Sequence, residues 1–295
     1  MALIRDILAA KIAARQPAIS FEFFPPKTEE GDRNLLERQI PALLATRPDF
    51  CSVTYGAGGS TREKTLMIVD RIQRDHHLTA LAHLTCVNHT QAEILALLEK
   101  FRALGCHNIL ALRGDPPGGG VFQATANGFE YSSQLVKFIR DHGDFSVGTA
   151  GFPEGHIACT AGKHTDWHHL REKIDAGADF VLTQLFFDNA DYFEFRDYLT
   201  QKLGVTVPLI PGIIPILNAG QITKFTQLSG AKVPTALQQS LDKLVGNDEA
   251  ATEFGIEYAT RQCEELLRAG VPGLHFYTLN KARSTVQVLK NLHLA

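Results

Sequence analysis

The sequence predicts an α/β protein in which eight β-strands alternate with helices and close into a (β/α)8 barrel, the TIM-barrel fold. Apolar strand segments recur eight times along the 295 residues, and most begin about 30 residues after the one before, the length of one βα unit. They do not strictly alternate apolar with polar residues, as is typical of parallel strands covered on both faces. The alternative, an open doubly wound sheet, would favour a Gly-x-Gly-x-x-Gly turn after the first strand, where this chain has Phe24-Pro25-Pro26.

Each predicted strand is a short apolar segment that ends in a turn or in polar residues. The first ends at Pro25 and Pro26, because proline has no N–H for the sheet and restricts the residue before it. The second runs into the glycine-rich stretch 56–59, and prolines interrupt the seventh. In chain order the strands are predicted at 20–24, 50–55, 80–87, 107–112, 146–152, 180–187, 208–215 and 273–280.

The helices are predicted from apolar residues at helical spacing, such as Leu36, Ile40 and Leu43. Thr90 and Glu93 form a capping box at the start of one helix. One extra helix precedes the first strand, and extra helices precede the last strand. The helices are predicted at 1–11, 29–46, 62–75, 90–105, 131–142 and 166–176, from the sixth strand to 203, and at 219–228, 235–245, 249–269 and 281–292.

Size, charge and cysteine content limit the class of protein. No low-complexity linker divides the chain, so we expect a single domain, 1–295. The net charge of −3 disfavours a sequence-independent nucleic-acid binder, and no apolar run reaches the roughly 18 residues that cross a bilayer. Five scattered cysteines without a Cys-x-x-Cys indicate reduced thiols and a cytoplasmic protein. The apolar face of the first helix suggests an interface in a homo-oligomer.

Functional side chains are predicted at the carboxyl end of nearly every strand, where barrel enzymes place their active sites. Taken alone, Glu22 fits an edge-strand carboxylate as well as an active-site acid, and a lone His83 is more often a core residue. Gathered on one face of a barrel, the set predicts a pocket and an enzyme. It comprises Glu22, Thr54, Tyr55, His83, Arg113, Gly114, Asp115, residues 150–156, Gln184, Pro211, Gly212, Tyr277 and Asn280.

Two further patterns concern ligands. Glycines at 56–59 and 118–120 allow close backbone approach to a flat or phosphorylated ligand, although glycines are ordinary in such loops. His164, His168 and His169 suggest a metal, but they straddle a predicted helix start with Asp166 as its cap, and no cysteine lies at ligand spacing. We therefore expect no metal site.

Seven motifs, in order from near residue 20 to near residue 281, together resemble those of the 5,10-methylenetetrahydrofolate reductases. No single motif is specific, but the set is, and it covers essentially the whole chain. The length resembles that of the bacterial form, which has only the catalytic domain, so no regulatory domain is expected. The motifs are Ser20–Pro26, Val53–Ala57, His83–Cys86, Ala111–Asp115, Thr183-Gln184 followed by Phe186–Asp188, Pro211–Ile213 and His275–Asn280.

The resemblance implies an FAD-dependent oxidoreductase of one-carbon metabolism and methionine synthesis. NAD(P)H would reduce FAD at the strand ends and leave, and methylenetetrahydrofolate would then take the hydride and become 5-methyltetrahydrofolate, a ping-pong sequence. Glu22 would be the general acid as the folate ring opens, and Asp115 the carboxylate between flavin and pterin. The sequence does not distinguish NADH from NADPH.

The resemblance also assigns binding residues position by position. Residues that would contact FAD are Thr54, Tyr55, Ala57, His83, Arg113, Gly114, Asp115, Ser132, Ala150, Phe152, His156, Asp166, His169 and Lys173. Residues that would contact the folate or the nicotinamide are Glu22, Thr54, Asp115, Gln184, Gln221, Phe225, Tyr277 and Lys281.

The chain departs from the family pattern at several of these positions. Phe152 stands where tyrosine is common, Ile157 where proline is usual, and Lys281 replaces a planar arginine by a point charge. His169 and Glu172 also differ.

Three other classes of protein stay open at this point. A glycoside hydrolase would use Glu22 and Asp115 as its carboxylate pair, but such pockets favour tryptophan and the chain has only Trp167. Another flavin barrel, such as a proline dehydrogenase, lacks this motif set. A non-enzymatic binding protein would leave the polar strand ends unexplained.

Overall fold

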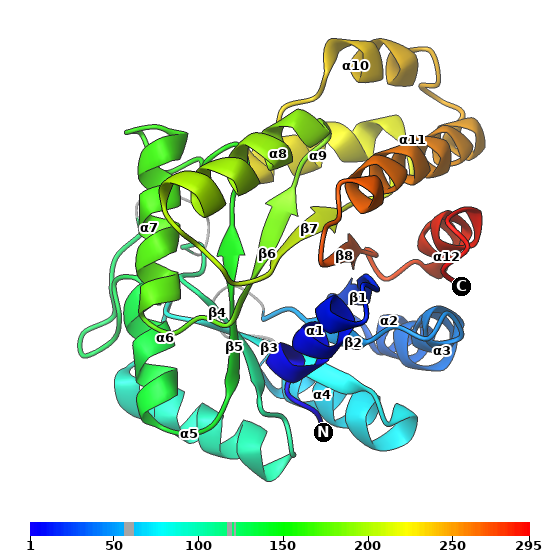
Figure 1. The fold of residues 1–295 in the computed structure, drawn as a ribbon. Helices are drawn as coiled ribbons and strands as arrows, with labels where there is room; N and C mark the ends of the chain where they lie inside the picture. The colour runs from blue at the N-terminus through cyan, green and yellow to red at the C-terminus, as the bar shows by residue number, and fades with distance from the viewer. Residues whose placement is uncertain (56–61, 117–119, 121) are drawn as a thin grey trace.

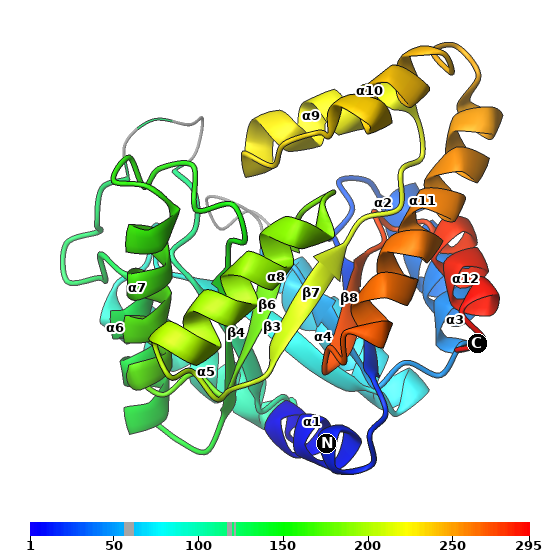
Figure 2. The same ribbon diagram turned by 45° about the horizontal axis from the view of Figure 1, so that its top comes forward.

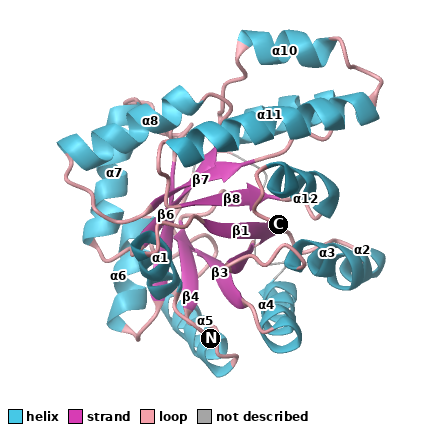
Figure 3. Ribbon diagram, turned by 45° about the vertical axis from the view of Figure 1, so that its right-hand side comes forward, coloured by secondary structure: helices cyan, strands magenta, loops and turns pink. Residues whose placement is uncertain are grey.

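The computed structural model describes residues 1–55, 62–116, 120 and 122–295, apart from four side chains within 223–228 (Figure 1). Eight parallel strands form a closed barrel in the order of the sequence, and helices surround it (Figure 3). The predicted (β/α)8 barrel is thus confirmed. The strands are β1 (Ala18–Phe23), β2 (Phe50–Val53), β3 (Thr79–Thr85), β4 (Asn108–Leu112), β5 (Ser146–Gly151), β6 (Phe180–Leu185), β7 (Leu209–Ile213) and β8 (Gly273–Tyr277).

Most helices lie within a few residues of their predicted bounds. They are α1 (Ile4–Ala13), α2 (Glu29–Asn34), α3 (Ile40–Leu44), α4 (Arg62–His76), α5 (Gln91–Ala103), α6 (Ser132–Asp141), α7 (Lys163–Asp175), α8 (Asn189–Asp197), α9 (Ala219–Ser229), α10 (Thr235–Asp242), α11 (Asp248–Arg268) and α12 (Ala282–Asn291). The capping box of Thr90 and Glu93 is present at the start of α5. No helix in the described ranges is both long and apolar enough to span a membrane.

Three helical predictions need correction. The helix predicted to end at 203 consists of α8 followed by a π-helical turn, Tyr198–Lys202. The helix predicted at 29–46 contains a π-helical turn, Leu35–Gln39, between α2 and α3. Pro41 follows it, and because proline has no N–H to donate, the regular ladder is interrupted there. The helix predicted from Asp166 begins at Lys163 instead, after Gly162 with φ of 94°, so Asp166 lies in the first turn and is not the cap.

The barrel interior has an apolar lower part. Alternate side chains of each strand point inward, and those nearest the amino ends of the strands form a lower core with α1. Ile4 and Leu8 of α1 are fully buried in it. The lower core consists of Ile4, Leu8, Ala18, Phe50, Leu81, Leu110, Phe180, Leu182 and Ile210.

Hydrogen bonds fasten α1 across the bottom of the barrel. The side-chain oxygen of buried Asn108 accepts from Ile4 N at 2.8 Å, and its nitrogen donates to Ala2 O at 3.1 Å. Arg5 N donates to Ser146 Oγ at 3.0 Å. The apolar face of the first helix is therefore used inside the chain, and our reason for expecting an interface there was wrong. A homo-oligomer stays a prediction without this support.

The segment between β7 and β8 departs from a simple βα unit. Helices α9 and α10 lie above the carboxyl ends of the strands, apart from the ring of helices (Figure 2). They share a small upper cluster with residues that follow β6 and β7. It consists of Leu185, Phe187, Ile214, Ile216, Ile222, Ala231, Leu237 and Leu241. The predicted extra helices thus cover part of the barrel mouth.

The seal made by α1 can be tested with two substitutions on that helix. Leu8→Ala should lower the free energy of unfolding by about 2–5 kcal/mol, because it leaves a cavity in the lower core. Ile12→Ala is the matched control, since Ile12 is 47% exposed and its truncation should change stability by less than about 0.5 kcal/mol. Urea unfolding curves measure both. Equal losses of stability in the two variants would contradict a role of α1 in closing the lower core.

Candidate active site at the barrel mouth

A polar layer lies directly above the lower core. Two residues beyond Ala18 and Phe50 along their strands, the inward positions become polar, and the register places Glu22 level with Ser52 on one side and Tyr277 on the other. His83 and His275 occupy inward positions of β3 and β8. Phe21 and Phe23 point outward and pack against the helices. The sequence reasoning thus placed Glu22 correctly on the inner face of β1.

The Glu22 carboxylate is buried among three polar side chains. Only 6% of Glu22 is exposed. Its Oε2 accepts a long hydrogen bond from Ser52 Oγ at 3.4 Å and lies 3.4 Å from His83 Nε2 and 3.5 Å from His275 Nε2. Neither ring nitrogen makes an aligned hydrogen bond in the described structure. The carboxylate is therefore close to several groups but tightly held by none of them.

The two histidines differ in their surroundings. Burial lowers the pKa of His83 to about 4, an effect that the charge of Glu22 opposes, so His83 is neutral at pH 7. His275 is fully buried, shares a 2.8 Å hydrogen bond between its Nδ1 and Ser20 Oγ, and stacks on Phe50. These contacts fix the plane of the His275 ring and direct its Nε2 toward Glu22.

Tyr277 of β8 completes the polar layer and contacts β6. Its hydroxyl donates to Thr183 O at 2.7 Å, and its ring occupies the space beside Gly212. A Cβ at Gly212 would lie 2.6 Å from that ring, so only glycine fits there. Burial, and then the charge of Glu22, raises the pKa of Tyr277 well above its ordinary value. The hydroxyl therefore stays protonated.

A cationic group gathers at the ends of β4 and β5. Burial lowers the pKa of His156, and the positive charges of Arg113 and Lys173 lower it further. The negative charges of Asp166 and Asp115 raise it. Lys173 Nζ donates to Ala150 O at 2.6 Å, and the rings of Phe152 and His156 meet edge to face at 4.5 Å.

The residues at the ends of β4 and β5 were predicted to contact one cofactor, and the structure does bring them together. Burial lowers the pKa of Lys173 to about 8. Gly114, with φ of 81°, approaches the end of β3 so closely that a Cβ would lie 2.7 Å from Val87.

The side chain of Tyr55 is hydrogen-bonded to a histidine. Its hydroxyl lies 3.0 Å from His89 Nε2, while His89 Nδ1 lies 2.7 Å from Val87 O. Because a carbonyl can only accept, His89 carries its proton on Nδ1 and accepts from the tyrosine hydroxyl. Burial raises the pKa of Tyr55 to about 12.

Other predicted residues lie around the mouth rather than inside the polar layer. Asp115 is exposed and makes no hydrogen bond or ion pair with another described residue, and Gln184 bonds to the backbone of Leu185. Gln221 and Phe225 are on α9, and Lys281 precedes α12. Thr54 follows β2, Ser132 opens α6 and His169 is an exposed residue of α7. Ala57 lies outside the described residues, as do the glycines at 56–59 and 118–119.

One cluster of possible metal ligands was not foreseen. Ligand atoms of Cys159, Asp166 and His169 lie within 4.8 Å of one another. Histidine spacing alone does not predict this cluster, because Cys159 lies seven positions before Asp166. Three exposed or half-exposed ligands fall short of the closed four-ligand shell of a structural zinc site. Two of them are also residues that the resemblance assigns to FAD.

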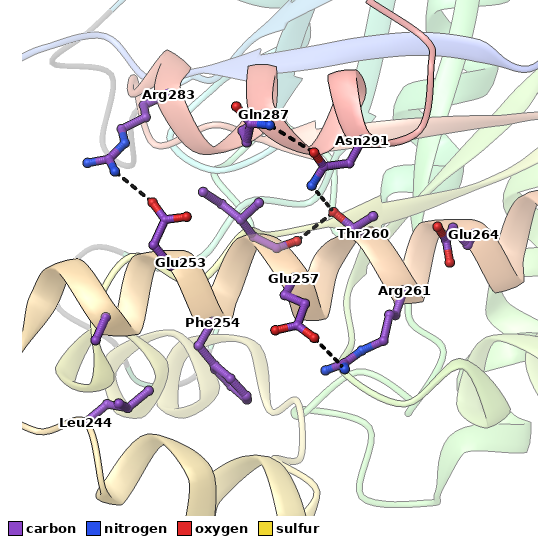
Figure 4. A pocket seen from close by; sticks show the side chains of 12 residues that line it. Leu244, Glu253, Phe254, Glu257, Thr260, Arg261, Glu264, Arg283, Gln287 and Asn291 are labelled. Carbon is purple, nitrogen blue, oxygen red and sulfur yellow. Dashed lines mark hydrogen bonds and ion pairs between the residues drawn. The ribbon is translucent and has the colours of Figure 1, made fainter.

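Two cavities lie outside the polar layer. The larger, about 830 Å³, lies between α11 and α12 and is lined by ion-paired side chains such as Arg283 with Glu253 (Figure 4). It contains none of the predicted site residues. The smaller, about 510 Å³, includes Lys281 and Asn280 beside Pro26. Asn280 bonds to both backbone groups of Phe24 and so ties the end of β8 to the end of β1.

Sequence reasoning missed three members of the polar layer: Ser20, Ser52 and His275. A simple signal was present. Ser20 and His275 each lie two residues before a predicted site residue on the same strand, so they share its inward face.

The fold and the site define a (β/α)8-barrel protein with polar and partly cationic side chains at the carboxyl ends of its strands, the usual place of a barrel active site. The sequence comparisons identify which barrel family this is. The model of the family "Methylenetetrahydrofolate reductase" matches residues 7–293. The chain belongs to the methylenetetrahydrofolate reductase family.

Relatives of about the same length as this chain and relatives about twice as long both support this assignment. The 5,10-methylenetetrahydrofolate reductase of Escherichia coli K12 is 36% identical, with 98% of this chain and 95% of that protein covered. Methylenetetrahydrofolate reductase (NADH) 1 is 40% identical in Zea mays, over 100% of this chain, and 41% identical in Arabidopsis thaliana, over 95%. The chain spans about half the length of these plant relatives, 51% and 49%.

A solved structure shares the fold. It is an uncharacterized protein from Clostridium thermocellum that binds two copies of 5-methyl-5,6,7,8-tetrahydrofolic acid, with a TM-score of 0.65 and 16% identity over 97% of this chain and 99% of that one. The glycoside hydrolase, the other flavin barrel and the binding protein lose their support with the family assignment.

The buried neutral state of His83 predicts a pH dependence of stability. Between pH 6.5 and about 4 the unfolded chain binds a proton that folded His83 does not, so stability falls as the pH falls through this range. The pKa difference corresponds to about 3 kcal/mol. His83→Gln should remove this part of the slope, whereas surface His77→Gln should keep it. Urea midpoints from pH 7 to 4 give the measurement, and identical slopes for wild type and His83→Gln would refute the assignment.

Proposed function

We propose that this protein reduces 5,10-methylenetetrahydrofolate to 5-methyltetrahydrofolate with NADH or NADPH, through bound FAD and by a ping-pong sequence. The observation that carries the proposal is the buried, loosely held Glu22 carboxylate at the mouth of a barrel of this family. The E. coli relative, which this chain matches almost end to end, is named for this reaction. The two plant relatives are named for NADH. A cytoplasmic location is part of the same proposal.

The residues at the mouth fit a flavin dinucleotide. Arg113 and Lys173 place two cations around His156, and this arrangement suits a pyrophosphate. Thr85 Oγ1 is buried without a hydrogen bond in the described structure, so it is available to a ligand. The bare backbone at Gly114 allows close approach.

The positions that depart from the family pattern affect single contacts to the ligands and do not include Arg113 or Lys173. Phe152 offers no hydroxyl, but its ring lies 6.0 Å from Lys173 Nζ and can face an aromatic ligand.

When bound, the flavin would supply the two-electron hydride chemistry that no side chain can provide. The chain's own residues would handle the proton. Glu22 would donate it to the folate as the five-membered ring opens, because its buried carboxyl group lies at the barrel mouth and is held tightly by no partner. Ser52 and the two histidines would fix its orientation.

Other residues would bind and orient the substrates. The Gln184 amide on β6 and the phenol of Tyr277, which lies beside Gly212, would face the pterin or the nicotinamide. Lys281 would attract an acidic part of the folate. Asp115, exposed at the end of β4, has its carboxylate available to a pterin.

Glu22→Gln separates the two half-reactions. The amide has nearly the same shape but cannot donate an acidic proton, so reduction of the flavin by NADH should stay within about threefold of wild type. Folate reduction should fall by about 10²–10⁴-fold, the usual contribution of a general acid. Stopped-flow absorbance at the flavin band measures each step. Equal loss of both steps would contradict the acid role.

Lys173 provides a test of the cofactor site. The wild-type protein should be yellow and should bleach when NADH or NADPH is added without oxygen. Because the pKa of Lys173 is about 8 before FAD binds, affinity for FAD should weaken as the pH rises through this value. Lys173→Met should bind FAD about tenfold more weakly and without this pH step. Fluorescence titration of the flavin-free protein measures the affinity, and a colourless wild type that does not bind FAD would overturn the proposal.

A further inference from the structure

A buried carboxylate holds the segment that follows α9. Both oxygens of Glu154, in the loop after β5, lie 3.1 Å from the backbone nitrogen of Lys232, which donates to them. The Glu154 side chain is only 7% exposed, whereas that of Lys232 is 79% exposed, with its Nζ 4.0 Å from the carboxylate. The main-chain N–H is therefore the principal partner, and the lysine charge adds little.

Neighbouring contacts place this bond at the end of α9. Gly230 ends the helix with φ of 75°, and a Cβ there would lie 3.3 Å from Ile157. Ala231, next to Lys232, is buried in the upper cluster. The loop after β5 and the chain that leaves α9 thus pack against each other over several residues.

The carboxylate occupies an unfavourable place for a charge. Burial raises the pKa of Glu154, and the charges of Asp191 and Asp188 raise it further, while the bond from Lys232 N lowers it. A carboxylate surrounded in this way needs a hydrogen-bond donor, and the Lys232 amide is the donor that the described structure provides. The contact therefore has a specific partner and is not a chance surface meeting.

The other end of α9 is also fastened. Asn218 caps it by accepting from Gln221 N at 2.9 Å, and Gln221 Oε1 accepts from Leu217 N at 2.8 Å. Thr252 of α11 donates to Leu217 O at 2.7 Å. Helix α9, which carries Gln221 and Phe225, is thus held at one end by α11 and at the other by Glu154.

We propose that Glu154 is a positioning residue that fixes α9 over the barrel mouth and couples it to loop 152–157. The inference rests on the proposed function, in which Phe152 and His156 of that loop contact the cofactor, and Gln221 and Phe225 of α9 contact the substrates. Glu154 itself touches no reacting group. It acts by keeping the two binding elements at a constant separation.

Hydrogen exchange of the purified chain tests the contact without reference to activity. Glu154→Ala should speed amide exchange across residues 219–232 by about tenfold, the effect of losing one charge-assisted hydrogen bond. Glu154→Gln should restore wild-type exchange, because its amide oxygen still accepts. Lys232→Pro removes the N–H, and Lys232→Ala, which keeps it, is its matched control. Unchanged exchange in both Glu154→Ala and Lys232→Pro would overturn the inference.

Steady-state kinetics test the positioning role. Glu154→Ala and Lys232→Pro should raise KM for the folate by about tenfold with kcat within about twofold, while Glu154→Gln and Lys232→Ala behave as wild type. Retained flavin should be equal in all four variants. Faster exchange with unchanged KM, or flavin loss confined to Glu154→Ala, would overturn the role. A wild type that neither binds FAD nor reduces folate would instead refute the proposed function, and the exchange result would still decide whether the contact holds α9.

Discussion

The barrel mouth depends on one division inside the barrel, an apolar lower core beneath a polar upper layer. The lower core is closed by Ile4 and Leu8 of α1, which leaves the carboxyl ends of the strands as the place where inward polar side chains can meet a ligand. Glu22, His83 and His275 stand directly on this apolar layer. Burial lowers the pKa of His83, although the charge of Glu22 opposes this effect.

The surroundings of the mouth fall into two electrostatic regions with different tasks. Around Glu22 lie neutral His83, the Ser52 hydroxyl and the Tyr277 phenol, whose pKa burial raises, and this set suits the holding and transfer of a proton. Around His156 lie the cations Arg113 and Lys173, beside the carboxylates of Asp166 and Asp115, and the two cations suit an anion. Helix α9 covers the mouth from above without belonging to either region.

Much of this arrangement follows from local sequence patterns. Period two along β1 predicts that Glu22 faces away from its phenylalanines, and strand ends predict which residues converge. Features that depend on distant or special contacts could not be predicted. Asp166 resembles a helix cap, but Gly162 at positive φ starts α7 earlier. The partner of Glu154 is a backbone amide 78 positions away, and because nearly every residue has an N–H, the sequence does not single out this one.

The attachment of α1 also constrains how the chain folds. The first helix is synthesised before any strand, yet its partners Asn108 and Ser146 are 104 and 141 residues further along. Until β4 and β5 have formed, α1 lacks its hydrogen bonds with Asn108 and Ser146. Closing so long a loop delays these contacts, so the bottom of the barrel should be completed late, as a lock on an assembled sheet and not as its nucleus.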